Sequence, residues 1–125
     1  MSTKYGVLAV VAFVMLCAPV TGDGAEKFQK LSGPQIRARF TGMEMTDNVH
    51  WADVFGGNGS LTAYSMGKKK EGKWRIDNDE LCIERGKDEG GCYQVWMSGT
   101  KVEFRREGLP DAIFEGVLQR RTARN

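Results

Sequence analysis

The chain has 125 residues, 41% of them hydrophobic and 27% charged, and carries a formal net charge of +2. This length corresponds to one domain with a thin hydrophobic core rather than to several domains. A charge so close to balance gives no indication of nucleic-acid binding, which relies on a strong local excess of basic residues.

The N-terminal segment has the features of a cleavable secretory signal peptide. Lys4 supplies a positive charge, an apolar run follows from Tyr5 to Val20, and small and polar residues come next. The run is shorter than the roughly 20 apolar residues that a membrane-spanning helix needs, so an uncleaved anchor helix is the less favoured alternative. We therefore predict a signal peptide over residues 1–24. The remaining residues 25–125 then form a single exported β domain, periplasmic or secreted, with no membrane span after cleavage.

One short helix is expected near the start of the mature chain, over residues 33–41. Ser32 is a favourable N-cap residue, and Gln35 three positions later completes a capping box. Leu31 before the cap and Ile36 in the helix form the hydrophobic staple that fixes how the chain enters the helix.

After the helix, the apolar residues alternate with a period of two, and turn residues recur every eight to twelve positions. This pattern predicts a mainly β fold, a small antiparallel meander or barrel-like sheet of about seven to eight strands. We expect residues 68–72 to form a turn and residues 120–125 to be a frayed tail. The expected strands are Val49–Phe55, Leu61–Met66, Lys73–Ile76, Leu81–Glu84, Cys92–Met97, Lys101–Arg105 and Ile113–Gln119.

Two cysteines remain after cleavage, because Cys17 lies inside the signal peptide. Cys82 and Cys92 fall on neighbouring expected strands, on the face that also carries Trp96. An even number of cysteines in an oxidising compartment predicts a disulfide. In the chain-entropy model, a bridge that closes a loop of about 11 residues raises the free energy of unfolding by roughly 3 kcal/mol. The alternative, a redox pair, normally separates its cysteines by two residues.

Several of these motifs together resemble a known group of proteins. The segments Gly72-Lys73-Trp74, Leu81-Cys82 and Gly91–Val95 follow a layout of G-x-W, then L-C, then G-C-x-x-V. In this respect the chain resembles small exported bacterial β proteins that are lipocalin-like in outline. The resemblance implies the fold and the exported location, and it transfers no catalytic residue.

Aromatic residues are abundant for a chain of this length, and those that do not fill the core are candidates for ligand contacts at a barrel mouth. We predict that the protein binds a small amphipathic ligand or an envelope protein partner, with residues 68–73 at the rim of the site. The basic residues there are either solvated surface charges or contacts for an acidic partner or a membrane surface. The predicted ligand-binding residues are Trp51, Tyr64, Trp74 and Trp96.

A second hypothesis is a Cu(I) site. Met43 and Met45 share one face of an extended segment, and thioether sulfur together with the imidazole of His50 selects Cu(I). Methionine is also an ordinary core residue, so the pattern has two interpretations. His50 is the only histidine, and neither a nucleophilic serine turn nor a free cysteine accompanies it. We therefore expect a non-enzymatic protein without catalytic residues or a cofactor.

Overall fold

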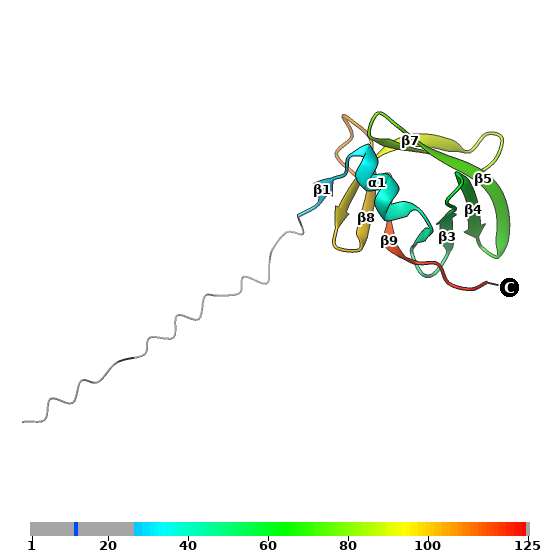
Figure 1. Cartoon of the computed structure of the whole chain (residues 1–125), viewed down its shortest axis with the longest axis horizontal. Helices are drawn as coiled ribbons and strands as arrows, with labels where there is room; N and C mark the ends of the chain where they lie inside the picture. The colour runs from blue at the N-terminus through cyan, green and yellow to red at the C-terminus, as the bar shows by residue number, and fades with distance from the viewer. Residues whose placement is uncertain (1–11, 13–26, 125) are drawn as a thin grey trace, which may run out of the picture.

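A computed structural model describes residue 12 and residues 27–124 (Figure 1). The predicted signal peptide lies outside the described residues, apart from that single position. The described part contains one helix, α1 (Gly33–Phe40), and nine strands. The strands are β1 (Gln29–Lys30), β2 (Met43–Thr46), β3 (Trp51–Phe55), β4 (Ser60–Ser65), β5 (Lys68–Asp77), β6 (Glu80–Glu84), β7 (Gly90–Ser98), β8 (Lys101–Arg105) and β9 (Phe114–Arg120).

Strands β2 to β9 form a closed antiparallel barrel of eight strands. Each strand hydrogen-bonds to the next one along the chain, and β9 returns to pair with β2. The short strand β1 is additional and pairs with the second half of β7. The predicted mainly β, barrel-like fold with one short helix is therefore confirmed.

The sequence prediction was wrong at residues 68–72, which belong to a strand and not to a turn. The reversal occurs at Met66 and Gly67, whose φ angles are 51° and 79°. Lysine and glycine residues at 68–72 suggested a turn from composition alone. In the structure their backbone groups pair with residues 61–65 of β4, so long-range pairing overrides the local signal.

The core fills the interior of the barrel, and strand register determines which residues reach it. Residues directly opposite each other on antiparallel strands point to the same face. The pairs Trp74–Ile83, Leu81–Tyr93 and Val95–Phe104 are opposite in this way, and all six side chains are buried. Cys82 and Cys92 are also opposite each other, on the outer face, and form the predicted disulfide.

Helix α1 closes one end of the barrel (Figure 1). Its capping box forms as predicted, because Ser32 Oγ accepts the Gln35 backbone N–H and Gln35 Oε1 accepts the Ser32 N–H at 2.8 Å. Ile36 and Phe40 are fully buried, and the Phe40 ring meets the Phe55 ring edge-on with centroids 5.1 Å apart. The helix therefore forms a lid of apolar side chains over that end of the core.

The opposite end of the barrel has no helix over it among the described residues. Four connections lie there, as the strand directions and registers require: β2–β3 (residues 47–50), β4–β5 (66–67), β6–β7 (85–89) and β8–β9 (106–113). We refer to this end as the open end. All three large hydrophobic residues that the described part exposes lie on its loops, namely Val49, Met66 and Leu109.

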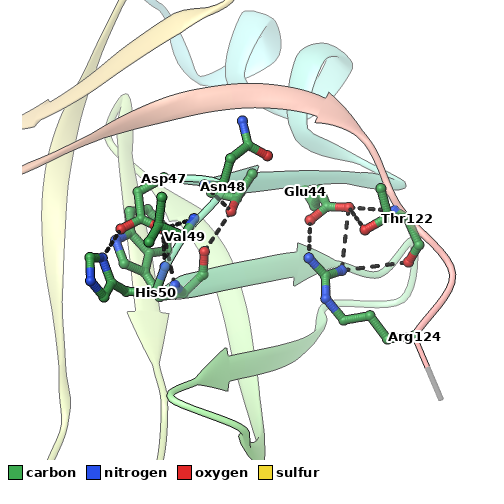
Figure 2. A network of polar contacts seen from close by, with 9 residues as sticks. Glu44, Asp47, Asn48, Val49, His50, Thr122 and Arg124 are labelled. Atoms are coloured by element: carbon green, nitrogen blue, oxygen red, sulfur yellow. Dashed lines mark hydrogen bonds and ion pairs between the residues drawn. The ribbon is translucent and has the colours of Figure 1, made fainter.

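Residues 121–124, which the sequence predicts to fray, lie against the outer face of the barrel (Figure 2). Glu44 on β2 is fully buried there. Its carboxylate accepts hydrogen bonds from the backbone N–H and hydroxyl of Thr122 and from Arg124, whose Nη2 lies 2.8 Å from Glu44 Oε2. The Arg124 guanidinium also lies 4.9 Å from the centroid of the Tyr64 ring. The C-terminal segment is thus fixed by one buried carboxylate.

Candidate ligand-binding cavity

A cavity of about 660 Å³ opens at the open end of the barrel. This volume falls within the range of about 300–1,000 Å³ that is typical of small-molecule sites. The cavity is formed by the inner faces of several strands and by the β6–β7 loop. Its lining residues are Trp51, Asp53, Ala63, Tyr64, Ser65, Met66, Lys68, Lys70, Arg85, Glu89, Gly90, Tyr93 and Phe114.

The cavity exists because strand β5 changes partner halfway along its length. Residues 68–73 pair with β4, whereas residues 73–77 pair with β6. The first half of β5 therefore has no second strand beside it within the described chain. Gly72 permits this crossing, since a Cβ there would lie 1.9 Å from the carbonyl oxygen of Glu84. The wall of the barrel is consequently open at this corner, next to the β6–β7 loop.

Aromatic rings form the apolar wall of the cavity. The Tyr93 and Phe114 rings meet edge-to-face with centroids 5.6 Å apart, and Tyr93 stacks on the buried Phe104 at 5.6 Å. Trp51 contributes from β3 and packs against the same core. Because the rings hold each other in place, the wall is formed before any ligand arrives, which reduces the entropy cost of binding.

An ion pair between Asp53 and Arg85 adds a polar element to this lining. Arg85 Nε lies 3.2 Å from both carboxylate oxygens of Asp53, and its Nη2 lies 2.5 Å from Oδ2. The Asp53 side chain is only 3% exposed. Burial disfavours the charged form of Arg85, but hydrogen bonding and attraction to Asp53 outweigh that effect and raise the pKa of Arg85. The guanidinium also lies 5.3 Å from the Phe114 ring centroid, so it is positioned from two sides.

Two exposed lysines of β5 line the cavity. Lys68 lies opposite Ser65, and Lys70 lies opposite Ala63, which is buried on the inner face of β4. Because directly opposed residues point to the same face of the sheet, both lysines lie on the inner face. Lys70 Nζ lies 3.2 Å from Glu89 Oε1 in the β6–β7 loop. Lys69 belongs to the outer face and pairs with Glu71 at 3.4 Å.

The structure brings together two of the four aromatic residues that the sequence indicated as ligand contacts. Trp51 lines the cavity from the inner face of β3, whereas Tyr64 touches its edge from the outer face of β4, where the Tyr64 ring also meets Arg124. Trp74 lies in the core with 5% of its surface exposed, and its Nε1 donates to the Gly56 carbonyl at 2.9 Å. Trp96 lies on the outer face, where the Arg105 guanidinium is 4.3 Å from its ring centroid. The four residues therefore occupy three different environments.

Sequence reasoning did not assign several of the lining residues to the site, among them Asp53, Arg85, Tyr93 and Phe114. Asp53 could have been recognised, because the alternation of β3 places this carboxylate between Trp51 and Phe55 on the inner face. No comparable signal marked Arg85, whose partner lies 32 positions away in the chain.

The residues of the Cu(I) hypothesis lie in contrasting surroundings. Met45 is fully buried in the core, and Met43 packs against the core while partly exposed. The His50 side chain is 63% exposed, and its Nδ1 lies 2.9 Å from Asp47 Oδ2 (Figure 2). Across residues 12 and 27–124, no three His, Cys, Asp or Glu side chains gather into a group that could hold a metal ion.

Asp47 organises the β2–β3 loop at the open end. Its Oδ1 accepts the backbone N–H groups of Val49, His50 and Trp51 (Figure 2). Desolvation acts to raise the pKa of Asp47, but these three bonds, together with the His50 ring, lower it well below its usual range. The loop beside the cavity is thus held in one conformation by a single carboxylate.

No protein-family model, curated protein or solved structure matches the chain. The lipocalin-like resemblance drawn from the sequence motifs therefore stays a prediction. In the described part of the chain, no helix is both long enough and apolar enough to cross a bilayer.

Proposed function

We propose that this chain is an exported, non-enzymatic binding protein that holds a small amphipathic ligand in the cavity at the open end. The observation that carries the proposal is the cavity of about 660 Å³ with an aromatic wall and charged groups beside it. Sites for small ligands combine a mainly apolar lining with a few fixed polar groups, and this cavity has both. The disulfide between Cys82 and Cys92 supports export, because such bonds persist in oxidising compartments.

The Asp53–Arg85 pair supports a binding role over a packing role for this region. Replacing a buried ion pair by well-packed apolar residues is often neutral or stabilising, so a purely structural role gives little reason for a charged pair at this position. Its position on the lining of a cavity that remains open supplies polar atoms to a bound molecule.

The test compares two tryptophans that are both partly buried. Trp51 lines the cavity, whereas Trp96 lies on the outer face. The measurement is fluorescence titration of the neutral dye Nile red into the wild type, Trp51→Leu and Trp96→Leu. We expect Trp51→Leu to weaken binding about tenfold, since loss of a large aromatic contact costs about 1.5 kcal/mol or more. Trp96→Leu should bind the dye as the wild type does.

A second variant separates loss of the cavity from loss of the fold. Ala63→Leu adds volume to the cavity lining, so it should also weaken dye binding, and circular dichroism and the melting temperature establish that the variant is folded. Equal dye affinity in all four proteins would contradict the proposal. The other function that the sequence suggests, capture of an envelope protein, would then become the leading explanation.

A further inference from the structure

We propose that the natural ligand is a monoanionic amphiphile of the long-chain carboxylate class, whose charged group is held by Lys68 at the mouth of the cavity. This inference rests on the proposed function, since it names the class of molecule that the same cavity accepts. The apolar body of the ligand would lie along the aromatic wall.

The first step is the direction of the Lys68 side chain. Strand β5 alternates between the two faces of the sheet, and Lys68 lies opposite Ser65 on the inner face. Lys69 lies opposite Tyr64 and points outward. Consecutive lysines therefore have different roles, and only Lys68 and Lys70 line the cavity.

The second step is the balance of charge around the cavity. Its lining contains three cationic side chains, Lys68, Lys70 and Arg85, and two anionic ones, Asp53 and Glu89. Arg85 is engaged by Asp53, and Lys70 is engaged by Glu89. Lys68 is left without an ion pair or side-chain hydrogen bond among the described residues. The cavity thus has one uncompensated positive charge, which matches one negative charge on a ligand.

The third step is the orientation of the ligand. Lys68 is exposed at the rim, whereas Tyr93 is buried and Phe114 is half-buried behind it. A carboxylate beside Lys68 would keep part of its hydration, which avoids the large cost of burying a charge. The chain of the ligand would meanwhile replace water against the rings, where burial of apolar surface is favourable. An anion at the mouth with an apolar body inside is therefore the arrangement that these positions favour.

The experiment measures binding of three probes with the same ten-carbon chain, decanoate, decan-1-ol and decylammonium, by isothermal titration calorimetry. The proteins are the wild type, Lys68→Gln and the matched control Lys69→Gln. An exposed ion pair contributes up to about 1 kcal/mol, so we expect decanoate to bind the wild type about two- to fivefold more tightly than the alcohol. Lys68→Gln should remove this preference, and Lys69→Gln should retain it. Lys68→Glu should shift the preference to decylammonium.

The outcomes distinguish this inference from the function on which it rests. If none of the three probes binds the wild type, the proposed function itself is wrong. If the alcohol binds as tightly as decanoate, or if Lys68→Gln and Lys69→Gln reduce the preference equally, the cavity binds amphiphiles but the assignment of an anion to Lys68 is wrong. Circular dichroism and melting temperature establish that each variant is folded.

Discussion

Single residues stabilise this small barrel by satisfying buried charges, and Glu44 is the clearest example. Its carboxylate is fully buried on the outer face of β2, yet Thr122 and Arg124 provide it with hydrogen bonds and an opposite charge. Desolvation acts to raise the pKa of Glu44, but the bonds from Arg124 and Thr122 outweigh it, and the pKa is lowered. The C-terminal residues therefore contribute to stability as long as Glu44 stays ionised.

The first prediction concerns Arg124→Ala. The free energy of unfolding at pH 7 should fall by about 1–3 kcal/mol, since the variant leaves a buried carboxylate without its cation. A lowered pKa in the folded state means that the stabilisation is complete above the pKa of the unfolded chain and is lost as pH falls through the folded value. Urea unfolding at several pH values should therefore show the difference from the wild type shrinking below about pH 4.

The control for this prediction is Arg121→Ala, because Arg121 lies on the same tail and makes none of the contacts to Glu44. The free energy of unfolding of Arg121→Ala should lie within about 0.5 kcal/mol of the wild-type value, as is usual for surface substitutions. Equal destabilisation by both variants would mean that the tail contributes through general charge and not through the Glu44–Arg124 pair.

At the scale of elements, the β4–β5 turn combines two unfavourable features at Met66. Positive φ at both central residues is typical of a type I′ hairpin turn, which favours Asn-Gly. Here the first position is Met66, with φ 51° and 75% of its surface exposed, followed by Gly67. A left-handed backbone conformation is costly for most side chains, and an exposed methionine gains nothing from burial in the isolated protein.

The second prediction follows from this turn. Met66→Asn should raise the free energy of unfolding by about 0.5–1 kcal/mol, because asparagine adopts the left-handed conformation more readily. The measurement is urea unfolding at neutral pH. Leu109→Asn serves as the control, since Leu109 is 50% exposed on a loop and its φ is not positive. If both variants gain the same stability, the effect comes from removal of exposed apolar surface and not from turn geometry.

At the scale of the whole molecule, the two ends of the barrel are built differently, and the sequence indicates only one of them. The closed end depends on local signals, because the capping box at Ser32 and Gln35 involves residues three apart. Most strands could also be predicted, because they show a short-range alternation of apolar residues. The disulfide could be predicted from the even number of cysteines. The capping box and the disulfide were predicted and are confirmed, and the seven expected strands correspond to β3 through β9, whereas β2 was not among them.

The open end depends on long-range pairing, which composition does not reveal. Residues 68–72 resemble a turn until β4 pairs with them, and the two residues of β1 are too few to show a period. The partners Asp53 and Arg85 come from β3 and the β6–β7 loop and meet only after the barrel closes. The cavity is formed by these same contacts, so its position could not be read from local sequence patterns.

The most direct test of the account uses the three tryptophans as reporters of three environments. Trp51 lines the cavity, Trp74 lies in the core, and Trp96 lies on the outer face. The measurement is the indole N–H region of an ¹⁵N–¹H NMR spectrum, titrated with decanoate and then with decan-1-ol. We predict that the Trp51 signal shifts in a saturable way while the Trp74 and Trp96 signals stay in place. A shift of Trp96 without Trp51, or no shift of any signal at saturating ligand, would contradict the claim that the open end of this barrel binds amphiphiles.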